Sequence, residues 1–286
     1  MNSISAVVHT TPVPRAPHEL YLDLMKRTLS RTITAQDRER HTLRARHPLK
    51  RLALAVATGV LAPFSLELVR VIQPTADDYL ESGHEATNRG EGAETMLGTR
   101  QLDNMQACIA DVIENRIPGD ILEAGVWRGG MTILMRAALK AYGDSDRLVW
   151  VVDSFEGLPD TESREDSFGW KGGDMAVSLE QVRQNFARYG LLDDQVRFLK
   201  GFFSNSLPSA PIAQLAVLRV DADLYGSTKD VLTHLYPKLS TGGYAIFDDY
   251  LNLSDCRRAI DEYRAAHDIT DEIRAIDKRA VYWQKR

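Results

Sequence analysis

Short apolar segments alternate with amphipathic ones from about residue 100 to the end of the chain, and this order limits the possible folds most strongly. The segments at residues 147–153 and 215–220 are apolar over most of their length. Such runs are typical of strands buried on both faces, since helices cover both faces of a parallel sheet. The alternation therefore predicts an α/β fold with a mostly parallel sheet.

The boundaries of the expected elements follow from the same periodicity. We expect helices at residues 102–117, 131–141, 179–189, 227–239 and 255–267. We expect strands at residues 121–126, 147–153, 196–199, 215–220 and 243–247. The final segments, 272–277 and 279–284, indicate two short strands joined by a tight turn, so one strand at the end of the sheet should be antiparallel.

The N-terminal third lacks this order. Residues 1–18 contain three prolines and no apolar period, so we interpret them as a disordered tail. A helix is expected from Glu19, in a helical and lid-forming extension at 19–98 that precedes the main domain, 99–286. The apolar run 52–66 is shorter than a membrane span. It predicts a buried or interface helix, with contact to a membrane surface as the alternative.

The composition disfavours several classes of protein. The net charge of −5 argues against a nucleic acid partner, because such a partner requires a basic face. The two cysteines, Cys108 and Cys256, have the spacing of neither a zinc cluster nor a disulfide framework, and their scarcity fits a cytoplasmic location. We expect neither a signal peptide at the N-terminus nor stable membrane insertion.

Acidic and glycine-rich residues follow the predicted strands, where an open parallel sheet binds its ligands. Unpaired aspartates are costly to bury. The pattern therefore indicates a water-filled crevice, a metal or a cofactor rather than core packing. The segments concerned are 123–130 (EAGVWRGG), 153–159 (DSFEGLP), 221–223 (DAD) and 248–249 (DD).

The first of these turns, residues 123–130, is not a dinucleotide fingerprint. The pattern G-x-G-x-x-G is missing, because Val126 and Trp127 follow Gly125. Glu123 stands at the start of the turn, and its carboxylate would repel a pyrophosphate but attract a cation or an amino group. The glycines still allow a ligand to lie close to the backbone.

Asp153 ends the second predicted strand, where an acid commonly accepts hydrogen bonds from the hydroxyl groups of a ribose. A ribose, an ammonium group and no phosphate together describe S-adenosylmethionine, which we expect as the cofactor. Taken alone, the glycine turn is equally compatible with a structural role. The presence of Asp153 on the neighbouring strand is what favours the cofactor.

A second acidic cluster consists of Asp221, Asp248 and Asp249. One helix separates the two strands that they follow, so adjacent parallel strands would bring the three carboxylates to one rim. Like charges this close need a cation or raised pKa values, and Mg²⁺ suits oxygen ligands. Such a metal would act as a Lewis acid on a substrate diol. In the alternative, Asp221 or Asp249 caps the next helix, and Asp223 has such a capping role or lies beside the metal ligands.

Several segments together match one family of enzymes. They are residues 20–27, 91–104, 123–130 and 153–159, combined with the spacing of the aspartate cluster. In these segments the chain resembles the macrocin-type O-methyltransferases, which methylate sugar hydroxyls of macrolide and aminocoumarin antibiotics with S-adenosylmethionine and Mg²⁺. The resemblance implies a Rossmann-like class I methyltransferase fold, with a mostly parallel seven-stranded sheet, a final antiparallel strand and an N-terminal helical extension. Residues 30–75 depart from the family pattern.

The resemblance also implies roles for single residues. Asp221, Asp248 and Asp249 would bind the metal, with Asp221 also the general base, and residues 171–178 would form a mobile lid. The complete set of expected cofactor-binding residues is Thr95, Met96, Glu123, Gly125, Gly129, Asp153 and Ser154. The N-terminal part of family members shapes the acceptor pocket and the subunit contacts. We therefore expect a homo-oligomer that takes a small-molecule glycoside as acceptor.

Other functions remain open at this point. A catechol or a glycolipid sugar would present the same vicinal diol to a metal, so the sequence does not separate these acceptors from an antibiotic sugar. A non-catalytic cofactor-binding protein is the alternative from another class, although it gives three convergent carboxylates no purpose. Phe202 and Phe203 follow the third strand and fit either adenine packing or core packing.

Overall fold

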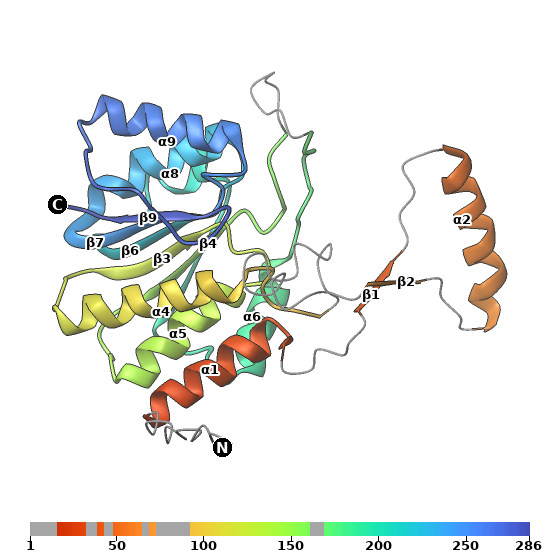
Figure 1. Ribbon diagram of the computed structural model, residues 1–286, viewed down its shortest axis with the longest axis horizontal. Coiled ribbons are helices and arrows are strands. Elements are labelled where there is room, and N and C mark those ends of the chain that lie inside the picture. Colours follow the sequence, from red (N-terminus) through yellow and green to blue (C-terminus); the bar gives the residue numbers. More distant parts are fainter. Residues whose placement is uncertain (1–15, 33–38, 43–47, 65–68, 73–91, 161–168) are drawn as a thin grey trace, which may run out of the picture.

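A seven-stranded sheet forms the centre of the molecule (Figure 1). The computed structural model describes residues 16–32, 39–42, 48–64, 69–72, 92–160 and 169–286. The expected tail, residues 1–18, thus lies almost wholly outside the described residues. The strands of the sheet are β3 (Asp120–Ala124), β4 (Val149–Asp153), β5 (Val196–Lys200), β6 (Leu215–Val220), β7 (Leu239–Phe247), β8 (Arg274–Ala275) and β9 (Val281–Gln284).

The order of the strands is β5-β4-β3-β6-β7-β9-β8. The first five strands in this order are parallel to their neighbours, whereas β9 is antiparallel to both β7 and β8. The predicted parallel sheet with a final antiparallel strand is therefore confirmed. The point at which the order reverses lies between β3 and β6, and an open sheet of this kind binds its ligand there.

Helices cover both faces of the sheet. They are α4 (Thr99–Glu114), α5 (Gly130–Tyr142), α6 (Leu179–Arg188), α7 (Phe203–Ser206), α8 (Tyr225–Leu235), η4 (Tyr236–Lys238) and α9 (Ser254–Ala266). In Figure 1, α8 and α9 lie on one face, and α4 and α5 lie on the other. Ile121 and Leu122 are adjacent on β3, both are fully buried, and each belongs to a different core cluster. This two-sided burial explains the continuous apolar runs of the sequence.

The N-terminal helix α1 (Pro17–Leu29) packs against α5 (Figure 1). It begins two residues before the expected position, because Pro17 suits the first turn of a helix and Glu19 accepts a hydrogen bond from the Ala16 N–H at 2.9 Å. The side chains of Leu22 and Leu29 are completely buried in the core beside α5. The helix thus packs on the core of the main domain, and the division of the chain at residue 98 stays a prediction.

The expected apolar helix forms α2 (Pro48–Leu61), which the short 3₁₀ helix η2 (Ala62–Phe64) extends. An antiparallel pair, β1 (Glu39–Thr42) and β2 (Val69–Ile72), flanks this helical segment. Several apolar side chains of α2 are exposed within the single chain, for example 64% at Leu52, whereas Leu54 and Leu61 are half-buried. Of the two roles expected for this run, burial within the chain does not hold for these exposed side chains, and the interface role stays a prediction. No helix among the described residues is long and apolar enough to cross a membrane.

Candidate active site

A cavity of about 440 Å³ opens at the carboxyl ends of β3, β4 and β6. Four of the expected cofactor-binding residues line this cavity, together with two aspartates of the second acidic cluster. The lining residues predicted from the sequence are Met96, Gly125, Asp153, Ser154, Asp221 and Asp248. The other predicted residues are buried in the surrounding structure and do not line the cavity, namely Thr95, Glu123, Gly129 and Asp249. The structure therefore brings the two expected clusters to one cavity.

The glycine turn is required first by the packing of the chain itself. Gly125 has a φ of +87°, and a Cβ placed on it would lie 1.8 Å from the carbonyl oxygen of Asp221. The ends of β3 and β6 approach this closely because the Asp221 N–H donates to the Ala124 carbonyl at 2.9 Å. The structural role that the sequence left open for this turn is therefore present, and Gly125 lines the cavity as well.

The second half of the turn holds the segment that contains Thr95 and Met96. Gly129 adopts a φ of +84° and caps the N-terminus of α5. The next N–H, that of Gly130, donates to the Glu94 carbonyl at 3.0 Å, and a Cβ at Gly130 would lie 2.5 Å from that oxygen. This contact places Met96 at the wall of the cavity.

Asp153 links the turns that follow β3 and β4. Its Oδ2 accepts from the Val126 N–H at 2.8 Å, and its Oδ1 accepts from the Phe155 N–H at 2.7 Å. Burial raises the pKa of Asp153, and these backbone hydrogen bonds oppose that rise. Ser154 Oγ also donates to Oδ1 at 3.4 Å, so the protein itself holds this carboxylate in place at the wall of the cavity.

Three carboxylates converge at the acidic rim. One oxygen from each of Asp221, Asp223 and Asp249 lies within 4.8 Å of the other two. Asp249 Oδ1 accepts from Arg279 Nη2 at 3.1 Å, whereas its Oδ2 is buried and has no hydrogen-bond partner among the described residues. Burial raises the pKa of Asp249 well above its ordinary value, and the neighbouring Asp223 and Asp221 raise it further. Asp223 thus lies in the cluster itself.

Asp248 lies beside this group and faces two guanidinium groups. Its Oδ1 accepts from Arg219 Nη2 at 2.6 Å, and its Oδ2 accepts from Arg279 Nη2 at 3.3 Å. Burial is the main cause that raises its pKa, and Asp221 adds to the rise. Of the three predicted metal ligands, the structure therefore brings Asp221 and Asp249 together directly. Asp248 adjoins them through the arginine that it shares with Asp221.

Sequence reasoning missed Arg219, which is 1% exposed at the centre of these acids. Its Nη1 donates to Glu123 Oε1 at 2.6 Å and to Asp221 Oδ2 at 2.9 Å. Glu123 is itself buried, and burial raises its pKa to about 8 although the Arg219 charge opposes this. The chain's own guanidinium therefore occupies the cation position that we expected beside Glu123. A cofactor contact of Glu123 stays a prediction.

Comparison with known proteins decides the family. Residues 18–285 match the model of the family described as macrocin-O-methyltransferase (TylF). A demethyldecarbamoylnovobiocin O-methyltransferase from Streptomyces niveus is 43% identical over 288 aligned positions, which cover 99% of each chain. The chain belongs to the macrocin-O-methyltransferase family. The resemblance noted in the sequence is thereby confirmed, as is the predicted enzyme class, an O-methyltransferase.

Two further relatives of this family member support the assignment. The solved structure of the O-methyltransferase NovP is 43% identical and superposes with a TM-score of 0.77, covering 94% of this chain and 99% of that one. An 8-demethyl-8-(2,3-dimethoxy-alpha-L-rhamnosyl)-tetracenomycin-C 4'-O-methyltransferase from Streptomyces olivaceus is 52% identical over 198 residues. These cover 67% of this chain and 76% of the relative. The likeness to NovP confirms the predicted methyltransferase fold.

The expected lid of this macrocin-type methyltransferase, residues 171–178, is hydrogen-bonded to the segment 153–159 that follows β4. The Leu158 N–H donates to the Asp174 carbonyl at 2.9 Å, and the Gly173 N–H returns a hydrogen bond of 2.9 Å to the Leu158 carbonyl. Met175, from the same segment, lines the cavity. The aromatic side chains that line the cavity are those of Trp127, Trp170, Phe202, Phe203 and Tyr225. The cavity-lining position of Phe202 and Phe203 is compatible with adenine packing, one of the two roles that the sequence left open.

Proposed function

We propose that this family member is an S-adenosylmethionine-dependent, Mg²⁺-assisted O-methyltransferase that methylates a sugar hydroxyl of a glycosylated natural product. The observation that carries the proposal is that Asp153, from the predicted cofactor site, and Asp221 and Asp248, from the predicted metal site, line one and the same cavity. The relatives support the acceptor class, since one of them is named for a rhamnosyl tetracenomycin. Cytoplasmic location and homo-oligomeric assembly belong to the same proposal.

The residues present fit S-adenosylmethionine. A volume of about 440 Å³ is within the usual range for small-molecule sites. Asp153 accepts hydrogen bonds and would bind the ribose, with Ser154 beside it, while Met96 and Phe202 supply apolar surface. When bound, this cofactor supplies an electrophilic methyl group. The task of the surrounding side chains is to hold the acceptor oxygen in line with it, since alignment supplies much of the rate.

The acidic rim fits a hard divalent cation. Oxygens of Asp221, Asp223 and Asp249 lie within 4.8 Å of one another, and Asp249 Oδ2 is a buried acceptor without a partner among the described residues. Asp221, Asp248 and Asp249 would hold the ion, as the sequence predicts, with Asp223 as a further carboxylate. When bound, Mg²⁺ would act as a Lewis acid that lowers the pKa of the acceptor hydroxyl.

We assign to Asp221 the removal of the proton from that hydroxyl. Its side chain is 28% exposed and lines the cavity, so it reaches both the rim and the solvent-filled space. Arg219 Nη1 holds one of its oxygens at 2.9 Å, which leaves the other oxygen for the acceptor or the ion. A carboxylate in this position would act as the general base of the methyl transfer.

A methyl-transfer assay over a panel of glycosides and catechols, with and without EDTA, tests the proposal. We expect turnover of glycosides that EDTA abolishes and added Mg²⁺ restores. Asp221→Asn should reduce kcat by about 10²-fold or more, whereas Asp194→Asn, at an exposed acid that follows α6, should not. Turnover that is indifferent to EDTA would refute the metal site. Turnover of catechols alone would refute the sugar acceptor.

A further inference from the structure

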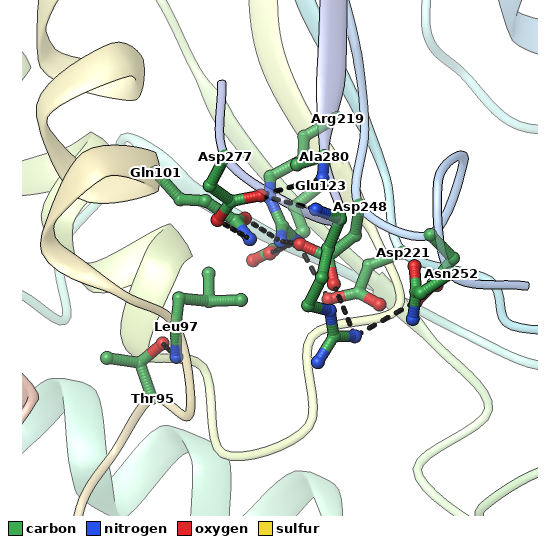
Figure 2. Close-up of polar contacts among 12 residues, drawn as sticks. Thr95, Leu97, Gln101, Glu123, Arg219, Asp221, Asp248, Asn252, Asp277 and Ala280 are labelled. Atoms are coloured by element: carbon green, nitrogen blue, oxygen red, sulfur yellow. Dashed lines mark hydrogen bonds and ion pairs between the residues drawn. The ribbon is translucent and has the colours of Figure 1, made fainter. Parts of the chain in front are cut away.

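The buried guanidinium of Arg219 is held in one orientation by acceptors on both of its terminal nitrogens (Figure 2). Nη1 donates to Glu123 at 2.6 Å and to Asp221 at 2.9 Å, and Nη2 donates to Asp248 at 2.6 Å. Two of these acceptors are proposed metal ligands. A planar guanidinium fixes the directions of its N–H bonds, so it fixes the carboxylates that accept from them as well.

A second layer holds the guanidinium in turn. Gln101 Oε1 accepts from Arg219 Nη2 at 3.3 Å, and Gln101 Nε2 donates to Asp277 Oδ2 at 3.0 Å. Gln101 and Asp277 are 4% and 7% exposed, so water does not replace these contacts. Asp277 Oδ1 also accepts from the Ala280 N–H at 2.8 Å and so anchors the loop between β8 and β9. Figure 2 shows this chain of contacts reaching from Gln101 to the acids of the rim.

Gln101 also lies close to the cofactor segment along the chain. It is the third residue of α4, whose N-cap is Gly98, and Met96 and Leu97 just before that cap line the cavity. The same short stretch of chain therefore contributes to the cavity wall and to the support of the acidic rim. Neither Gln101 nor Arg219 lines the cavity, so neither touches a ligand there.

We infer that Arg219 and Gln101 are positioning residues that orient the carboxylates of Asp221 and Asp248 for the metal ion. This inference rests on the metal site of the proposed function. Charge alone gives the opposite expectation, because a cation among these acids repels a second cation. Replacing Arg219 by lysine keeps the charge and loses the planar fork. Replacing Gln101 by methionine keeps the volume and the charge and loses only the two hydrogen bonds.

The test is the dissociation constant of Mn²⁺, used as a probe of the magnesium site and measured by electron paramagnetic resonance on the full chain. Residues that support metal ligands from behind typically contribute 10- to 100-fold to metal affinity, so we expect Arg219→Lys and Gln101→Met each to weaken Mn²⁺ binding by about tenfold or more. S-Adenosylmethionine affinity, measured by calorimetry, should stay within about twofold, because neither residue lines the cavity.

Matched controls come from the same fold. Arg136 on α5 forms a bidentate pair with Asp193, which Arg136→Lys removes, and Gln106 on α4 donates to Tyr142 at 3.0 Å, a hydrogen bond that Gln106→Met removes. Both changes lie outside the cavity lining and should leave Mn²⁺ affinity within about twofold. If Arg219→Lys does not fold, Gln101→Met tests the same orientation, since it leaves the guanidinium in place.

The outcomes separate this inference from the proposed function. Mn²⁺ binding by the wild-type chain that both variants weaken, but the controls do not, supports the positioning role. If the wild-type chain binds Mn²⁺ and Gln101→Met leaves that affinity unchanged, the positioning role is overturned while the metal site stands. Binding that Arg219→Lys makes tighter likewise overturns it in favour of simple charge repulsion. Absence of Mn²⁺ binding by the wild-type chain refutes the metal site itself, and this inference with it.

Discussion

Gly125→Ala tests the close approach of β3 and β6 on which the cavity depends. The new Cβ would lie 1.8 Å from the Asp221 carbonyl oxygen, and real Cβ atoms keep at least 3.0 Å, so the strand ends must separate by about 1.2 Å (3.0 − 1.8). A left-handed conformation costs a non-glycine residue about 1–2 kcal/mol. The separation also strains the hydrogen bonds of Gly125 N–H to Val152 and of Asp221 N–H to Ala124, each 2.9 Å. Each such bond contributes about 0.5–1.5 kcal/mol.

The free energy of unfolding should therefore fall by about 2–5 kcal/mol. Urea denaturation followed by circular dichroism measures it. Gly143→Ala is the matched control, because Gly143 has a φ of +73° and open space around its Cβ position. That variant should lose only the conformational part, about 1–2 kcal/mol. If Gly125→Ala loses no more than Gly143→Ala, the close packing of the two strand ends is wrong.

Three further predictions concern the cofactor, the N-terminal helix and the thiols. Asp153→Ala should weaken S-adenosylmethionine binding by about tenfold or more, since hydrogen bonds to charged groups contribute about 1.5–3 kcal/mol. Calorimetry measures this affinity, and the control Glu156→Ala, at an exposed residue, should leave it unchanged. Unchanged affinity of Asp153→Ala would remove the ribose assignment. Leu22→Ala should destabilise the fold by about 2–5 kcal/mol and Leu20→Ala, at a position 53% exposed, by far less, in the same urea assay. Burial raises the pKa of Cys108 to about 12, so native protein at pH 8 should resist a thiol reagent that labels the denatured chain; rapid native labelling would contradict the burial.

Periodicity predicted the elements well wherever one pattern dominated. The strand expected at 215–220 is β6 to the residue, and the helix expected at 255–267 differs from α9 by one residue at each end. The helix expected at 227–239 fails at its end, because α8 stops at Leu235 before Pro237 and a 3₁₀ turn follows. Strand β7 then begins at Leu239, four residues earlier than predicted.

The glycines explain why that earlier start was missed. Gly242 and Gly243 lie within β7, and glycine ordinarily weakens a strand. In the structure a Cβ at Gly243 would lie 2.7 Å from the carbonyl oxygen of Ala216 on β6. The glycine is therefore present because two backbones meet closely, a requirement that only the pairing of strands distant in sequence reveals.

The cavity residues that directly follow strands were predictable from the sequence. The partner of Glu123 was not predicted, because finding it requires the register in which β3 and β6 pair. Glu123 and Arg219 pair across β3 and β6, each as the penultimate residue of its strand. Given the predicted parallel order, a single arginine in an apolar strand beside an acid on its neighbour was a usable signal of an internal ion pair. An acid at a strand end attracts whichever cation is nearest, and a cation on the adjacent strand is fixed there by the fold. Such an acid is evidence for a ligand only once the cations of adjacent strands have been assigned. Glu123 Oε2 and Asp249 Oδ2 are both buried without a hydrogen-bond partner among the described residues, and each acid also contacts an arginine. Asp249 indicates a ligand more strongly because its carboxylate converges with those of Asp221 and Asp223 within 4.8 Å.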